Sequence, residues 1–448
     1  MTYLVGAMRH WNGLGLVATI ATLALTTGCP NDDDDGSSSG GSTATGTGAD
    51  TTVGGATTGA DETSTEAGSG STSGSTTAVV PTTGGPSTGD PTTGGEACGD
   101  GVAVAGQLCF APSASVTDVS TGVLALGDID DDGILDLVAG HIDGISVRLG
   151  VGDGTFGAAN DIGTPSGVLG LAVGLFDADL DLDVAVANTG DMTVGIHLGN
   201  GDGTFAAATL FDVGAGPRGL AAADFDGNGD LDIAVANESD GTVSILAGQG
   251  NGNFALDDTL NVGTNPSHVA AVDLDGGGPL DLAVLNFGSG SISVFLSTGL
   301  GFMPESAFVT GVGPRALVSA DFDDDGAIDI ATPNQINDNF SVLLGDGSGA
   351  LGGTNFFSTG QGPREGAVGD FDGDALPDVA IALESDNAVD VLRTDTEGAL
   401  SLEMGQPQPT LNRPIALVVG DLDGDGIDDI VVGGIEVGGG IAVLIATP

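Results

Sequence analysis

The chain has 448 residues and a formal net charge of −56, with 63 acidic residues against 7 basic ones, all of them arginine. Such an excess of negative charge excludes non-specific binding to nucleic acid or to an anionic membrane surface. Glycine occupies 81 positions, yet 40% of the chain is hydrophobic. The composition therefore excludes a collagen-like or wholly disordered protein and allows a large core.

Residues 1–28 are predicted to be a cleaved export signal. A short basic region precedes the apolar run 13–25, and small residues lead to Cys29. A run of about 13 residues is too short to span a bilayer. The stretch LTTGC resembles a bacterial lipobox, which implies that Cys29 becomes a lipidated N-terminus, although Thr26 stands where that motif usually has leucine. Plain secretion with an incidental cysteine is the alternative, and a start at Met8 would not change the destination.

Residues 29–96 are predicted to be this lipidated N-terminus followed by a disordered linker. The segment is rich in Ser, Thr and Gly with scattered Pro and acidic residues, so it cannot bury enough apolar surface to offset its chain entropy. Its flexible residues would span roughly 45 Å and hold the rest of the chain clear of a membrane. We expect an exported lipoprotein at the cell surface or in the periplasm, anchored to the outer membrane of a Gram-negative bacterium.

Residues 97–448 are predicted to be one folded domain, and from about residue 120 it consists of seven similar units. Phrases such as ADFDGNGDLDIAVAN and GDLDGDGIDDIVVGG recur at spacings of 47 to 51 residues. Repeats of this length with several short strands are typical of propeller blades. The third unit, for example, divides into four strands, the last beginning at Phe254. Helical periodicity is absent, so the sequence predicts an all-β, seven-bladed β-propeller with four-stranded blades.

The two ends of the repeat region are expected to meet in one blade. The seventh unit stops after its third strand, and the segment QLCFAPSASVTDV resembles the fourth-strand region of other units, with Phe110 in the place of Phe156. We therefore expect residues 107–119 to complete the last blade. An exported compartment permits a disulfide between Cys98 and Cys109 that would brace this strand. Unpaired thiols are the alternative.

An acidic pattern in the turn between the first two strands of a unit predicts a metal site. Five units carry DxDxDxxxD, with Asn allowed at the third acidic residue, and we call its acidic positions 1, 3, 5 and 9. Alternate residues of a tight turn point inward, so the carboxylates converge, and their repulsion is tolerable only around a hard cation such as calcium. The five sets are Asp128, Asp130, Asp132 and Asp136; Asp224, Asp226, Asn228 and Asp232; Asp321, Asp323, Asp325 and Asp329; Asp370, Asp372, Asp374 and Asp378; and Asp421, Asp423, Asp425 and Asp429.

Two units depart from this pattern. Leu175 replaces position 1 of the second unit, and Gly277 replaces position 5 of the fourth, so we expect these two sites to be weak or empty. Ordinary solvated Asp/Gly turns are the alternative for every unit. Five copies in register favour about five calcium sites instead.

The repeated phrases DFDGDGxxD and GDGTF resemble the FG-GAP and VCBS repeat family, known best from the propellers of integrin alpha subunits. The resemblance covers about residues 107–448. It implies a seven-bladed propeller, calcium in the turn between the first two strands of a blade, and a role in adhesion or extracellular binding. It implies no particular ligand, because such repeats occur on many proteins.

Three arginines share one position of their units. Arg218, Arg315 and Arg364 each follow a proline, six residues before position 1, on a loop that leads into the innermost strand. They could ring one mouth of a central channel and form a site for a carboxylate or a sulfated group. The alternative is that each pairs with an acid on the neighbouring blade, such as Glu238 or Asp240.

The sequence favours a binding module over an enzyme. His141, His197 and His268 fall at three different repeat positions without a recurring nucleophile, and the GxGDGT turns lack the lysine and helix of a phosphate loop. The processed chain would have no Trp or Tyr for a sugar-stacking site. We expect a monomeric, surface-tethered, calcium-binding propeller that binds an extracellular protein or an anionic polysaccharide, with an exported hydrolase or lyase on the same scaffold as the alternative.

Overall fold

Regular structure in the described chain consists of short β-strands. The computed structural model describes residues 110–112, 121–394, 403–404, 408–435 and 440–447, and within them all 29 regular elements are strands. Among these residues no helix is long and apolar enough to cross a membrane. The predictions for the export signal, the linker, Cys29, Cys98 and Cys109 lie outside the described residues.

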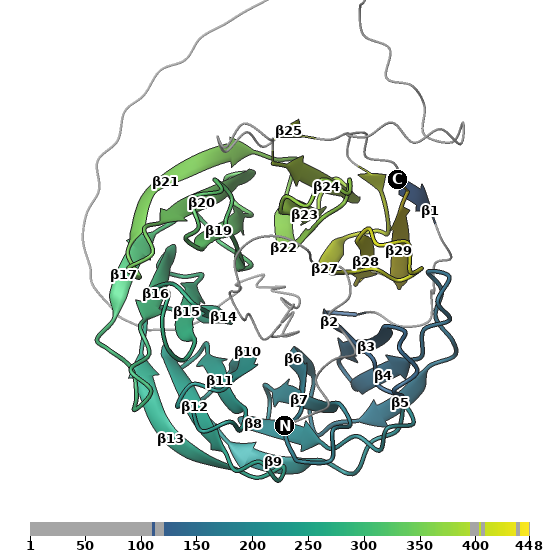
Figure 1. The fold of residues 1–448 in the computed structure, drawn as a ribbon, viewed down its shortest axis with the longest axis vertical. Helices are drawn as coiled ribbons and strands as arrows, with labels where there is room; N and C mark the ends of the chain where they lie inside the picture. The colour runs from purple at the N-terminus through teal and green to yellow at the C-terminus, as the bar shows by residue number, and fades with distance from the viewer. Residues whose placement is uncertain (1–109, 113–120, 395–402, 405–407, 436–439, 448) are drawn as a thin grey trace, which may run out of the picture. The chain divides into compact units, whose positions relative to one another are not determined.

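The strands form seven antiparallel sheets, the blades, arranged in a ring (Figure 1). We number the blades in chain order. Blades 1 to 4 contain β2 (Val123–Gly127), β3 (Asp136–His141), β4 (Gly144–Arg148) and β5 (Asn160–Gly163); β6 (Val168–Gly174), β7 (Asp183–Asn188), β8 (Thr193–His197) and β9 (Thr209–Asp212); β10 (Pro217–Ala223), β11 (Asp232–Asn237), β12 (Thr242–Gly248) and β13 (Phe254–Asn261); and β14 (Pro266–Val272), β15 (Asp281–Asn286), β16 (Ser291–Phe295) and β17 (Ser306–Val309).

Blades 5 to 7 continue this order, with two variations. The sixth sheet has a fifth strand, because β25 and β26 both pair with β24, and the seventh takes its outer strand from β1. The three blades contain β18 (Val318–Ala320), β19 (Asp329–Asn334), β20 (Asn339–Gly345) and β21 (Leu351–Ser358); β22 (Pro363–Gly369), β23 (Asp378–Leu383), β24 (Ala388–Arg393), β25 (Glu403–Met404) and β26 (Gln408–Pro409); and β27 (Pro414–Gly420), β28 (Asp429–Gly434), β29 (Ile441–Ala446) and β1 (Phe110–Pro112). The all-β, seven-bladed propeller predicted from the repeats is confirmed.

The seventh blade joins the two ends of the propeller. β1 pairs antiparallel with β29, with Phe110 opposite Ala446, and Figure 1 shows β1 in blue beside β29 in yellow. The structure thus places Phe110 beside the last strand, where the sequence predicts the closure strand. Pairing of this kind ties blade 7 to the start of the propeller and covers the edge of β29 over its last three residues.

Packing between blades buries the inner strands on both faces. Seven hydrophobic clusters each draw residues from two consecutive blades. Leu124 of β2 and Val418 of β27 share the cluster that joins blade 7 to blade 1, so the ring also closes through its core. Outermost strands such as β13 are exposed at most positions. Small and β-branched residues fill the inner strands because both faces must fit against a neighbouring sheet.

The innermost strands of adjacent blades approach each other closely. A Cβ atom added to Gly170 of β6 would lie 1.9 Å from the carbonyl oxygen of Arg218 in β10. Only glycine permits such an approach of two backbones. The first strands of the blades are therefore packed against one another, and the turn that follows each of them holds the acidic motif.

Candidate metal sites

The aspartate at position 9 is a buried structural element in all seven blades. In blade 5 the backbone N–H of Phe322 donates to Asp329 Oδ2 at 2.8 Å, and that of Gly345 donates to Oδ1 at 2.7 Å. One carboxylate therefore ties the acidic turn to the end of the third strand. The equivalent pairs of bonds occur at Asp136, Asp183, Asp232, Asp281, Asp378 and Asp429.

Burial makes these carboxyl groups hard to ionise without a cation. It raises the pKa of Asp232 and Asp329 to about 6 and that of Asp378 and Asp429 to about 7, although the N–H donors oppose the shift. The other carboxylates of each loop add repulsion in the same direction. A cation bound among them would favour the ionised form.

The aspartate at position 1 closes the turn on itself. Asp321 Oδ1 accepts from the N–H of Asp325 at 3.1 Å, and Oδ2 accepts from Gly326 at 2.8 Å. Gly326 adopts a positive φ of 88°, and Ala375 holds the same place in blade 6 with a φ of 67°. This sharp turn, for which glycine is the favoured residue, points the remaining carboxylates toward one another.

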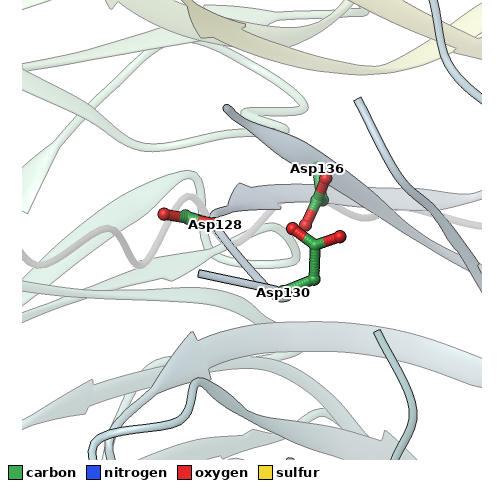
Figure 2. Close-up of side chains that lie close together, drawn as sticks. All are labelled: Asp128, Asp130 and Asp136. Atoms are coloured by element: carbon green, nitrogen blue, oxygen red, sulfur yellow. The ribbon is translucent and has the colours of Figure 1, made fainter. Parts of the chain in front are cut away.

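The turns bring their carboxylates within metal-binding distance. In blade 1 one oxygen each from Asp128, Asp130 and Asp136 lies within 4.8 Å of the others, and Figure 2 shows the carboxylates of Asp130 and Asp136 turned toward each other. Further groups meet the same limit: Asp224, Asp226 and Asp232; Asp321, Asp323 and Asp325; and Asp370, Asp372 and Asp374. In blade 7, Asp421 accepts from the N–H groups of Gly424 and Gly426, which gives the same turn.

The fourth unit keeps part of the geometry. Gly277 leads us to expect a weak or empty site, which stays a prediction, and Asp273, Asp275 and Asp281 converge within the same 4.8 Å. Positions 1, 3 and 9 are placed by the turn and by the buried bonds of Asp281, and neither depends on the residue at position 5. The unit lacks one ligand but keeps the geometry of the other three.

Two buried oxygens show that the loops suit a cation. Asp130 Oδ1 and Asp323 Oδ1 are shielded from solvent and accept no hydrogen bond from the described residues. Burial and the neighbouring carboxylates raise the pKa of both groups. An oxygen that is buried without a donor is costly unless a cation contacts it. Position 3 of blades 1 and 5 therefore fits a hard metal ion.

The arginines at the shared repeat position are buried and paired. Arg218 is 2% exposed and donates to Glu238 at 2.8 Å. Arg364 is 4% exposed and lies 3.3 Å from Glu384. Each of these acids belongs to the same blade as its arginine, so the alternative of an ion pair is right in kind, but the partner does not lie on the neighbouring blade. Such enclosed pairs favour the salt-bridge interpretation over a basic spot for an anionic ligand.

Links between blades come from other side chains around Glu384. Arg413 of blade 7 contacts its Oε1, and Gln335 of blade 5 donates to its Oε2 at 2.8 Å. Arg315 in turn donates to Gln335 at 2.7 Å and lies over the ring of Phe287 in blade 4, 4.2 Å from its centroid. These contacts connect four consecutive blades beside the innermost strands.

The three histidines lie in different surroundings. His197 and His268 are each 2% exposed, and His268 lies with Nδ1 3.4 Å from Ser267 Oγ and Nε2 3.8 Å from Glu365 Oε2 in a fully enclosed site. His141 Nε2 lies 3.2 Å from Ser146 Oγ, but the Ser146 hydroxyl donates to Asp161 at 2.5 Å and the serine is fully buried. Since the single hydroxyl proton points to Asp161, His141 is not placed to accept it.

Comparison with known proteins agrees with the fold. The N-terminal domain of BBS1 in complex with ARL6 is similar over 75% of this chain and 97% of its own, with 14% identity and a TM-score of 0.55. A streptogramin B lyase gives a TM-score of 0.53 at 14% identity over 76% of this chain and 98% of its own. An inactive virginiamycin B lyase from Staphylococcus aureus with quinupristin gives a TM-score of 0.52 at 14% identity, over 76% of this chain and 100% of its own. At these identities the likeness shows a shared propeller fold.

The repeat family follows from the sequence itself. The model of the FG-GAP-like repeat matches residues 176–235, 224–284 and 370–432, and these matches span acidic turns and inner strands of the ring. The chain is thus a seven-bladed propeller that contains three FG-GAP-like repeats, as its motifs predict. No curated protein matches the sequence.

Proposed function

We propose that this protein is an exported, calcium-binding propeller that acts as an extracellular binding module. The observation that carries the calcium assignment is the pair of buried oxygens, Asp130 Oδ1 and Asp323 Oδ1, in loops that hold three carboxylates together. Calcium accepts carboxylate oxygens in flexible numbers and geometry, which suits loops that differ at one position. The FG-GAP-like repeat match supports the same assignment.

The residues at positions 1, 3, 5 and 9 would hold the ion. When bound, calcium supplies positive charge that offsets the repulsion among these carboxylates. In blade 5, Asp321 keeps the turn closed and Asp329 anchors it to β20 through two backbone bonds. An ion shared by the turn and this anchored aspartate would fasten each loop to its blade. The function of calcium here is therefore to stabilise a rigid scaffold.

Export and tethering rest on the first 96 residues. The signal-like region and LTTGC precede a polar linker, which supports a lipid anchor at Cys29 on the outer membrane. The test is fractionation of cells that carry Cys29→Ala. We expect the variant in the soluble exported fraction, whereas unchanged membrane association would contradict the anchor.

Binding of an extracellular protein is the role that we favour for the propeller. His197 and His268 are buried, and the three repeated arginines are paired within the ring rather than exposed to a polymer. The test is capture of surface proteins by the mature chain with calcium and with EDTA. A calcium-dependent protein partner supports the proposal; retention only by sulfated or carboxylated polysaccharide would reassign the ligand.

A further inference from the structure

The sixth acidic loop differs from the others by a positively charged neighbour. Arg393, the last residue of β24, places Nη2 2.8 Å from Asp372 Oδ2. The Asp372 side chain is only 1% exposed, while Arg393 is 24% exposed. Asp372 is position 3 of the sixth loop, so the guanidinium contacts a carboxylate that would otherwise be a ligand.

The pairing register shows that this arginine is peculiar to blade 6. In every blade, the residue after position 9 lies on the second strand and pairs with one residue of the third strand. In blade 6 that partner is Leu392, and in the other blades it is Arg148, His197, Leu246, Phe295, Leu343 or Leu444. The residue that follows is apolar in the other six blades: Leu149, Leu198, Ala247, Leu296, Leu344 and Ile445. Only in blade 6 does this position carry a charge.

The reason lies in what these residues pack against. Leu149 lies near Gly203 and Leu296 near Gly349, each a glycine in the turn between the third and fourth strands of the next blade. Blade 7 follows blade 6 and takes its outer strand from β1, so no such turn connects its third and fourth strands. The position of Arg393 therefore has a different neighbourhood, in which a long polar side chain can reach the acidic loop.

Both oxygens of Asp372 have partners, in contrast to position 3 of blades 1 and 5. Oδ1 accepts from the N–H of Asp374 at 3.2 Å and Oδ2 accepts from Arg393. In blades 1 and 5, Asp130 Oδ1 and Asp323 Oδ1 are buried without a donor among the described residues. Because two cations that share one carboxylate repel each other, a guanidinium at Asp372 weakens the hold on calcium.

We propose that Arg393 is the resident cation of the sixth acidic loop and makes it the weakest of the five complete calcium sites. The inference rests on the proposed calcium function, which it deepens: the loops do not bind equally, and one residue outside the motif sets the order. Blade 6 keeps its turn with a side chain of the protein in the role that calcium has in blades 1 and 5.

The test is calcium titration of the full mature chain by calorimetry. Arg393→Leu, which introduces the residue found in blades 1, 2, 4 and 5, should gain one calcium equivalent or tighten one site by about tenfold. Arg393→Lys keeps the charge and should bind as the unchanged protein does. Arg413→Leu is the matched control, because it removes one arginine that pairs with Glu384, away from the acidic loops.

The outcomes separate this inference from the calcium function itself. The same number of sites and the same affinities in Arg393→Leu and in the unchanged protein would overturn the role of Arg393. An equal gain in Arg413→Leu would also overturn it, since net charge alone would then be the cause. No uptake by the unchanged protein would instead contradict the proposed function. If Arg393→Leu fails to fold by circular dichroism, Arg393→Met, with its flexible apolar chain, takes its place in the same titration.

Discussion

Within each acidic loop, position 9 and positions 1, 3 and 5 have different roles. The position 9 aspartate is present in all seven blades and always accepts two backbone N–H groups, even in blade 2, where Leu175 replaces position 1. The other acidic positions vary from blade to blade and lie in the turn itself. The comparison teaches that one motif serves two purposes, since position 9 ties the loop to its blade and the remaining positions gather carboxylates that could hold a metal ion.

Calcium removal should have the largest effect on the molecule. Extracellular modules bind calcium with dissociation constants of about 0.1 to 1 mM, so at about 1 mM each filled site adds roughly 0.4 to 1.4 kcal/mol to the free energy of unfolding. Five sites together would add about 2 to 7 kcal/mol, as much as the stability of many domains. We expect EDTA to lower the melting temperature sharply by circular dichroism, and added calcium to restore it.

Substitution at position 9 should come next and should not depend on calcium alone. Asp329→Ala leaves the N–H groups of Phe322 and Gly345 without their acceptor, and two such losses cost about 2 to 5 kcal/mol. Asp323→Ala at position 3 should cost only its calcium share, and nothing in EDTA. Denaturant unfolding of both variants with and without calcium distinguishes the two roles. If both variants lost the same free energy of unfolding in EDTA, positions 3 and 9 would have the same role.

The sequence could predict the ring but not these separate roles. Repeat spacing gave seven blades, and the match of Phe110 to Phe156 pointed to the closing strand, because both depend on local pattern. Asp329 and Asp323 look alike in sequence, and only the fold shows which of them receives two buried N–H bonds. Arg393 could have been noticed as the one charge among equivalent apolar residues, but its contact with Asp372 needs the packing of blade 6 against a blade without the usual turn.

The arginines carried a signal that the sequence-based prediction did not use. Glu238, Gln335 and Glu384 share one repeat position, twenty residues after Arg218, Arg315 and Arg364, and each contacts its own arginine. The repeat could therefore have predicted these pairs within a blade. The links from Arg413 and Gln335 to Glu384 join different blades, and only the fold shows them.

The pH dependence of the calcium-free protein sharpens the comparison further. Burial raises the pKa of Asp378 and Asp429 to about 7, so the folded state holds protons that the unfolded state has already released. Stability must then fall as pH rises from about 4 through 7. In EDTA we expect a lower melting temperature at pH 8 than at pH 5. With calcium the ionised form is favoured, so the difference in melting temperature between pH 5 and pH 8 should shrink or reverse. A melting temperature in EDTA that does not change with pH would contradict the raised pKa values of Asp378 and Asp429.

The smallest expected effect concerns a buried acid outside the loops. Asp390 is fully buried in β24, burial raises its pKa, and the register gives Ser244 and Ser341 as its equivalents. Those serines accept from Asn237 and Asn334, whereas Leu383 stands in the place of these asparagines in blade 6. Asp390→Ser should therefore stabilise the protein by about 1 kcal/mol at pH 8 and by little at pH 4. Thermal melts at the two pH values check this, and a loss at pH 8 would show that the carboxyl is well accommodated.

The most direct measurement is the number of calcium ions that the mature chain binds. Calorimetric titration of the metal-free protein should show uptake of about four or more equivalents with dissociation constants near about 0.1 to 1 mM, and Asp323→Asn should lose one of them while keeping its fold. If the unchanged protein takes up no calcium and EDTA leaves its melting curve in place, the acidic turns are solvated loops and the metal assignment is wrong.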